Sequence, residues 1–82
     1  QLVTEGLEAQ GFQVLPSLAN FVLARHQLLD GQQLYQKLKQ RDILVRWFDE
    51  PRIRDFVRIS IGTREDMQQL LAAVAEILQE VR

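Results

Sequence analysis

Two arginines that interrupt apolar runs are the residues best suited to bind a ligand. Arg46 lies in residues 43–48 (ILVRWF) and Arg58 in residues 56–61 (FVRISI). The β-branched and aromatic side chains of both runs predict strands. A guanidinium carries a permanent charge and a planar fork of N–H donors that fits a carboxylate or a phosphate. The sequence therefore offers two candidate positions for binding an anionic group.

Side-chain alternation along these strands predicts the direction in which the arginines point. Successive side chains of a strand lie on opposite faces of the sheet. One face carries Ile43, Val45, Trp47, Val57, Ile59 and Ile61, and the other carries Leu44, Arg46, Phe48, Phe56, Arg58 and Ser60. We expect the aliphatic face to pack on helices, so that both arginines point away from the core of the domain.

The alternative is that each arginine pairs with a nearby carboxylate. Asp49, Glu50 and Asp55 lie between the two arginines in the sequence. An exposed ion pair of this kind would need no ligand. The sequence by itself leaves both possibilities open.

The elements that must position the arginines follow from periodicity and turn signals. The order is a helix over residues 1–10, short strands over 12–15 and 20–25, a helix from Asp30, strands over 43–48 and 56–61, and a helix over 64–81. The turn residues around Pro51 indicate that the last two strands are antiparallel neighbours. We predict an α+β fold, a small and mostly antiparallel sheet with helices packed on one face.

Two helix starts carry recognisable caps. Asp30 with Gln33, and Thr63 with Asp66, have the spacing of a capping box. The last helix has an apolar stripe with a period of 3.6 residues, formed by Met67, Leu70, Leu71, Val74, Ile77, Leu78 and Val81. This stripe predicts the main helical contribution to the core.

Length and composition narrow the function classes. The 82 residues suffice for one domain, and we read Gln1 as a cut inside a longer chain. A formal net charge of −1 gives no general attraction to nucleic acid or to a membrane surface. The absence of cysteine excludes disulfides and thiolate metal sites. We expect the single histidine, His26, to lie in a surface loop and no metal to be bound.

Four segments in order resemble the small C-terminal domain of class I and II pyridoxal-phosphate aminotransferases. They are residues 17–25 (SLANFVLAR), 43–46 (ILVR), 56–63 (FVRISIGT) and 64–66 (RED). The combination of Asn20, Phe21 and Arg46 favours the histidinol-phosphate aminotransferase branch. Asp42 stands where a glycine is common in that branch.

The resemblance implies roles for three residues. Arg58 corresponds to the arginine that binds the carboxylate or another anionic group of the substrates. Arg46 corresponds to an arginine associated with the phosphate of the imidazole substrate. Asn20 lies in a segment that faces the active site, although an asparagine at a strand start also serves as a turn or cap residue.

The resemblance also implies what this chain lacks. The cofactor would be pyridoxal phosphate, and the reaction would be amino transfer between glutamate and imidazole acetol phosphate. The lysine that holds the cofactor is expected in a large domain outside the chain, because Lys37 and Lys39 lie on a polar helix end where nothing desolvates them. The chain would be catalytically incomplete, and the full protein would be a cytoplasmic homodimer acting on small amino and keto acids.

Three other functions remain possible at this point. The parent could be another class I or II aminotransferase, since relatives share the segment around Arg58. An RNA-binding module would use Phe48 and Phe56 on an open sheet face, but the net charge argues against it. A small ligand-binding domain would be expected to carry a glycine-rich loop, whereas Gly31 and Gly62 stand alone.

Overall fold

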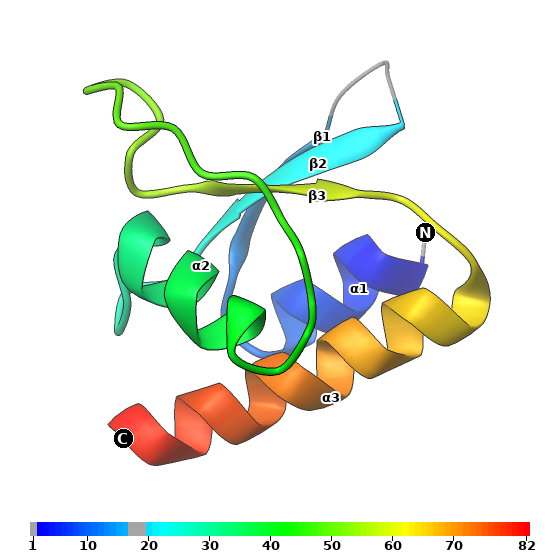
Figure 1. Ribbon diagram of the computed structural model, residues 1–82. Helices are drawn as coiled ribbons and strands as arrows, with labels where there is room; N and C mark the ends of the chain where they lie inside the picture. Colours follow the sequence, from blue (N-terminus) through cyan, green and yellow to red (C-terminus); the bar gives the residue numbers. More distant parts are fainter. Residues whose placement is uncertain (1, 17–19) are drawn as a thin grey trace.

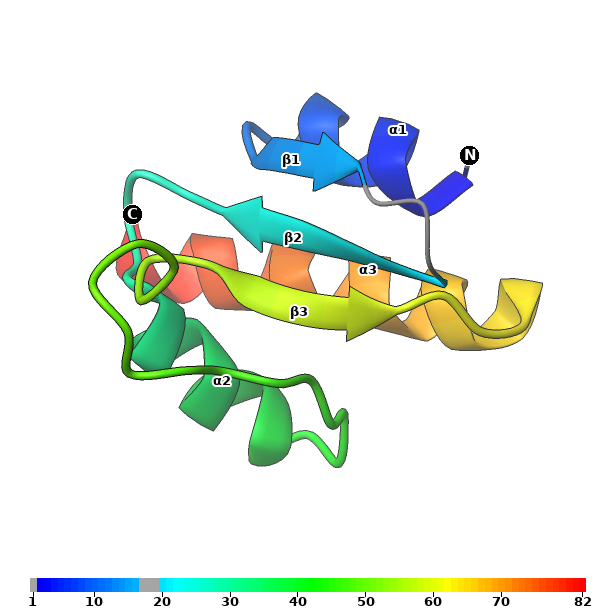
Figure 2. The same ribbon diagram turned by 90° about the horizontal axis from the view of Figure 1, so that it is seen from above.

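Three strands and three helices form two layers in the computed structural model, which describes residues 2–16 and 20–82. In chain order the elements are α1 (Leu2–Ala9), β1 (Gln13–Pro16), β2 (Phe21–Arg25), α2 (Gly31–Lys39), β3 (Val57–Ser60) and α3 (Arg64–Val81). The helices lie on one side of the sheet and leave its other face uncovered by any described element (Figure 1, Figure 2). This arrangement confirms the predicted α+β fold. Residues 17–19 of the predicted aminotransferase-like segment lie outside the described residues.

The sheet has the order β1-β2-β3, and both neighbouring pairs are antiparallel. The register places Leu23 of β2 opposite Arg58 of β3. The side chains that face the helices are buried, namely Val22, Ala24, Val57 and Ile59. The predicted alternation in β3 is therefore confirmed, and Arg58 points away from the core.

The predicted strand over residues 43–48 is wrong in extent. Only Arg46 pairs with β3, through two backbone hydrogen bonds with Arg58. On both sides of this bridge the segment forms hydrogen bonds with parts of the chain other than β3. The Ile43 amide donates to the Leu38 carbonyl at the end of α2 (3.0 Å), and Trp47 Nε1 donates to the Arg54 carbonyl (2.8 Å). The predicted antiparallel relation holds at the bridge, but these ties prevent a longer ladder.

The faces predicted for Val45, Arg46 and Phe48 are nevertheless confirmed. Val45 is buried against the core, while Leu44 is 78% exposed and Phe48 is 37% exposed. Arg46 and Phe48 lie on the face of the sheet that no described helix covers, whereas Leu44 lines a pocket with Met67 and Leu70 of α3.

Helix α3 supplies the largest share of the core and has the predicted bounds. Its buried residues are Met67, Leu70, Ala73, Val74, Ile77 and Leu78, and Leu71 and Val81 are partly buried. Helix α1 packs closely on α3. A Cβ at Gly6 would lie 2.6 Å from Leu71 Cδ1, which explains a glycine in the middle of α1. None of the three described helices has both the length and the apolar character that a membrane span needs.

Helices α2 and α3 begin at the predicted caps, but only the capping box of α2 has both of its hydrogen bonds. Asp30 Oδ1 accepts from the Gln33 amide (2.8 Å), and Gln33 Oε1 accepts from the Asp30 amide (3.3 Å), so that capping box is complete. Thr63 Oγ1 accepts from the Asp66 amide (3.1 Å), but the return bond from the Thr63 amide is not formed. The Asp66 carboxylate lies beside Gly62 instead.

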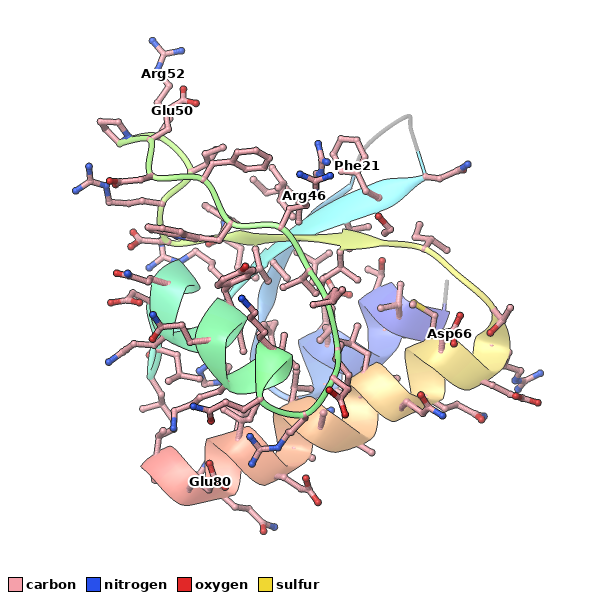
Figure 3. All side chains as sticks on the ribbon, in the orientation of Figure 1. Phe21, Arg46, Glu50, Arg52, Asp66 and Glu80 are labelled. Atoms are coloured by element: carbon pink, nitrogen blue, oxygen red, sulfur yellow. The ribbon has the colours of Figure 1, made fainter. Side chains whose placement is uncertain are left out.

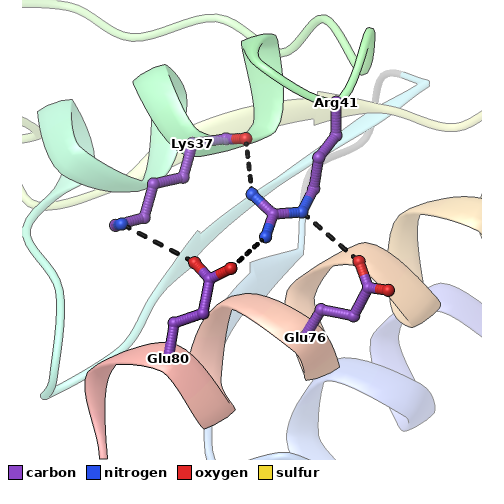
Figure 4. A network of polar contacts seen from close by, with 4 residues as sticks. All are labelled: Lys37, Arg41, Glu76 and Glu80. Carbon is purple, nitrogen blue, oxygen red and sulfur yellow. Dashed lines mark hydrogen bonds and ion pairs between the residues drawn. The ribbon is translucent and has the colours of Figure 1, made fainter.

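A charged network ties α2 to α3 (Figure 4). Arg41 bonds Glu80 (Nη2–Oε2, 2.6 Å) and Glu76 (Nε–Oε1, 3.4 Å), and Lys37 Nζ lies 3.8 Å from Glu80. Arg41 Nη1 also donates to the Lys37 carbonyl, which is one of the last in α2. The cations at the end of α2 therefore neutralise both the exposed carbonyls of that helix and the carboxylates of α3.

His26 is buried, contrary to the prediction of a surface loop histidine. The chain turns sharply over residues 26–29, so that the ring of His26 lies over the turn between α1 and β1. There it packs edge-on against the Phe12 ring, with the two ring centres 4.9 Å apart. Nδ1 accepts from the Leu28 amide (3.1 Å), and Nε2 lies 3.0 Å from the Gln10 carbonyl. Because Nδ1 accepts a hydrogen bond, the ring proton belongs on Nε2, which donates to Gln10.

Candidate anion-binding site

The two arginines predicted from the sequence lie side by side on the uncovered face of the sheet. Arg46 and Arg58 face each other directly across the antiparallel bridge, and residues paired in this way carry their side chains on the same face. Arg46 is exposed, whereas Arg58 is half-buried. Figure 3 shows Arg46 and Phe21 on the side of the sheet opposite the helices.

Arg58 lies against two aromatic rings. Its guanidinium carbon is 5.0 Å from the centre of the Phe21 ring and 5.3 Å from the centre of the Phe48 ring. Both distances are within the range of a cation–π interaction. Phe21 comes from β2 and Phe48 from the segment after Arg46, so two separate parts of the chain hold this guanidinium.

No carboxylate neutralises either arginine within the described residues. The ion pairs found there involve Lys37, Arg41 and Arg54, and Asp49 pairs with Arg54 at 3.5 Å. The alternative of local pairing through Asp49, Glu50 or Asp55 is therefore wrong. Two positive charges opposed on one face, without a counter-ion from residues 2–16 or 20–82, are suited to bind an anion.

Asn20 lies next to this site through its backbone. Its carbonyl accepts a hydrogen bond from the Ile61 amide (2.8 Å), which extends the ladder between β2 and β3 by one step. The residue is exposed, and no described hydrogen bond joins its side chain to Arg46 or Arg58. The structure thus brings the two arginines together and leaves Asn20 at the edge of the site.

Sequence reasoning missed Phe21 as a contact of Arg58. Residues 20–25 (NFVLAR) are nearly continuous in apolar character, which gives no reason to single out one aromatic side chain. The period-2 alternation would have placed Phe21 outward once Val22 and Ala24 were assigned to the core. A third arginine, Arg25, lies on the same face, 5.8 Å from the Phe56 ring centre.

The described residues offer no group that could hold a carbonyl cofactor or a metal beside the arginines. Lys37 is paired with Glu80, and Lys39 Nζ lies 5.9 Å from the Tyr35 ring centre. Both lysines belong to α2, in the layer behind the sheet. No cluster of His, Cys, Asp or Glu suited to a metal ion occurs in the described ranges. The site can bind and orient an anion, but this chain supplies no lysine for covalent chemistry there.

Comparisons with known proteins give a consistent result. Residues 1–74 match the family model described as aminotransferase class I and II. The histidinol-phosphate aminotransferase of Syntrophus aciditrophicus is 59% identical over 68 residues, which cover 83% of this chain and 19% of that protein. Histidinol-phosphate aminotransferase 2 of Rhizobium meliloti is 53% identical over 76 residues, covering 93% of this chain and 22% of that protein. The chain thus spans about a fifth of the length of these relatives.

Solved structures agree with the sequence relatives. A putative aminotransferase from Burkholderia pseudomallei superimposes with a TM-score of 0.79 at 37% identity, over 93% of this chain and 23% of that one. The histidinol-phosphate aminotransferase from Clostridium acetobutylicum gives a TM-score of 0.82 at 28% identity, over 96% of this chain and 25% of that one.

Proposed function

Because the chain belongs to the class I and II aminotransferase family, we propose that it is the C-terminal substrate-binding domain of a longer aminotransferase. The predicted resemblance to this family is confirmed by the match over residues 1–74. The proposal that residues 1–82 form one domain of a longer protein is supported by the short span of the relatives that the chain covers.

The proposed reaction of the full-length protein is amino transfer between glutamate and imidazole acetol phosphate, a step of histidine biosynthesis. Relatives that are 53–59% identical are named histidinol-phosphate aminotransferases, which supports this choice of substrates. The observation that carries it is the pair of arginines opposed across the bridge without a described carboxylate partner. Glutamate carries carboxylates and imidazole acetol phosphate carries a phosphate, and both kinds of anionic group suit a guanidinium.

The two arginines have different surroundings, which suggests different partners. Arg58 is half-buried between two rings, and its planar fork is suited to a bidentate carboxylate. Arg46 is exposed and is proposed to bind the phosphate. Asn20 is kept as a third substrate-binding residue on the strength of the resemblance, at the end of β2 next to this face.

The family uses pyridoxal phosphate, and the described residues of this chain do not fit that cofactor. Their lysines lie in the helical layer, remote from the arginines. We therefore place the cofactor and its lysine in the part of the protein outside this chain. The contribution of this domain is to bind the anionic ends of the substrate and to cover them from water. A cytoplasmic homodimer, as the family implies, completes the proposal.

A transaminase assay on the full-length protein tests this function. Glutamate serves as the amino donor, with imidazole acetol phosphate and a panel of other keto acids as acceptors. Preference for the phosphorylated acceptor is the expected result. Activity with other keto acids alone would identify a different class I or II aminotransferase, and no activity with any acceptor would overturn the proposal.

A further inference from the structure

Two phenylalanines hold the side chain on which the proposed function depends. We propose that Phe21 and Phe48 are positioning residues, which fix the Arg58 guanidinium in the orientation that binds a carboxylate. The proposal rests on the proposed function, because it assigns the two rings a role in substrate binding through Arg58. It also explains why two large aromatic side chains stand on the face of the sheet that no described helix covers.

The register of the strands places the two rings on opposite flanks of Arg58. Phe21 lies two residues before Leu23, the residue opposite Arg58 on β2. Phe48 lies two residues after Arg46, which is opposite Arg58 on the other side. Both are diagonal neighbours of Arg58, a separation that long and aromatic side chains span. Because both neighbouring segments run antiparallel to β3, one ring lies toward Ser60 and the other toward Phe56.

This arrangement lowers the cost of binding. A free arginine side chain samples many rotamers, and a ligand that fixes it must offset that entropy. Here the rings at 5.0 and 5.3 Å restrict the guanidinium before the ligand arrives. No carboxylate among residues 2–16 and 20–82 competes for its N–H groups. The donors thus stay available for a planar carboxylate while the rings attract the positive charge.

The neighbouring arginines provide internal contrasts. Arg46, on the same face, lies over no described ring and is exposed, so losing either phenylalanine ring should not affect it in the same way. Arg25 has its own ring, Phe56, at 5.8 Å. Phe56 belongs to the same face and run of sequence as Arg58 but does not hold its guanidinium. The change Phe56→Leu is therefore a matched control.

The experiment uses the full-length protein and the steady-state kinetics of amino transfer. Phe21→Leu and Phe48→Leu keep apolar bulk but remove the ring, and each should raise the KM for glutamate about two- to fivefold. The value of kcat should change little, because an interaction present in both ground and transition states affects KM. Phe21→Tyr and Phe48→Tyr keep a ring and should restore the KM. Phe56→Leu should leave it unchanged.

A double-variant series separates positioning from a general effect on packing. If the rings act through Arg58, adding Phe21→Leu or Phe48→Leu to Arg58→Ala should not raise the KM further. Full additivity in the double variants, or equal effects of all three leucine variants, would overturn the positioning role. Unchanged KM in Phe21→Leu and Phe48→Leu, with a raised KM in Arg58→Ala, would overturn it while keeping Arg58 as a ligand. Unchanged KM in Arg58→Ala would overturn both the positioning role of the rings and the ligand role of Arg58, while the amino transfer measured in the same assay would still support the proposed reaction.

Discussion

Arg46 and Arg58 exchange both of their backbone hydrogen bonds, with N–O distances of 3.0 and 2.8 Å, and so stand directly opposite each other on one sheet face. Like charges opposed in this way destabilise a strand pair. No described carboxylate relieves the repulsion. Places where a chain breaks such a local rule are commonly functional. The arrangement is accounted for if an anionic substrate supplies the missing charge.

Arg58 is the first residue to test in the full-length protein. We expect Arg58→Ala to lower kcat/KM for glutamate by an amount equivalent to about 2–5 kcal/mol, because a charge-assisted hydrogen-bonded pair with its carboxylate is lost. Arg58→Lys should restore little, since lysine lacks the planar fork. Cofactor content, measured by absorbance, should stay unchanged in both variants.

The control for Arg58 is an arginine outside the site. Arg52 is exposed in the loop before β3 and projects away from the sheet (Figure 3). Arg52→Ala should leave kcat/KM unchanged. Normal turnover in Arg58→Ala, or an equal loss in Arg52→Ala, would contradict a ligand role for Arg58.

Arg46 should distinguish the two substrates. Arg46→Ala should lower kcat/KM for imidazole acetol phosphate more than for glutamate, because only the former carries the phosphate proposed to bind there. Arg46→Lys should retain much of the activity, since lysine also binds phosphate as a point charge. Steady-state kinetics with each substrate varied separately would measure this difference. Equal losses for both substrates in Arg46→Ala would argue against the histidinol-phosphate assignment.

Much of the site could be predicted from periodicity. The alternation of apolar side chains placed Arg46 and Arg58 outward, and the stripe in the last helix gave the bounds of α3. These predictions succeed because the burial of one face is a local property of each strand or helix. Phe48 likewise lies on the uncovered face, as its alternation with Val45 and Trp47 predicts.

The remainder depends on contacts between distant segments. Phe21 meets Arg58 only because of the register between β2 and β3, which alternation within a single strand does not determine. The segment around Arg46 forms one bridge rather than a strand because Ile43 and Trp47 bond to other parts of the chain. His26 is buried because a turn brings its ring against Gln10, which lies 16 residues earlier in the chain. The sequence around each of these residues does not indicate which distant residue it will contact.

The support of the Arg46–Arg58 bridge can be tested at Gly31. A Cβ there would collide with the Arg54 carbonyl and would lie 2.7 Å from the Phe56 carbonyl and 2.8 Å from Trp47 Cδ1. Two of these atoms belong to the backbone and cannot move aside cheaply. Gly31→Ala should therefore destabilise the protein by about 1–3 kcal/mol, the usual cost of overpacking. The urea midpoint of unfolding would measure the loss.

Gly62 provides the matched control for Gly31. The three atoms nearest to a Cβ at Gly62 all belong to the side chain of Asp66, and the closest of them, Oδ2 at 3.0 Å, is its flexible end. Gly62→Ala should consequently shift the urea midpoint much less than Gly31→Ala. Equal shifts in the two variants would show that the close contact of α2 with the loop before β3 does not limit the stability.

His26 can be tested as a structural hydrogen-bonding residue. His26→Ala leaves the Leu28 amide and the Gln10 carbonyl without their partner in a part-buried turn, and each unsatisfied group costs about 1–3 kcal/mol when fully buried. His26→Asn keeps an acceptor near the position of Nδ1, so it should retain the bond to Leu28 and lose less stability. The urea midpoints of both variants, compared with the unmodified protein, would give the order of stability. If alanine and asparagine were equally tolerated without loss, the two hydrogen bonds of the ring would contribute nothing to the fold.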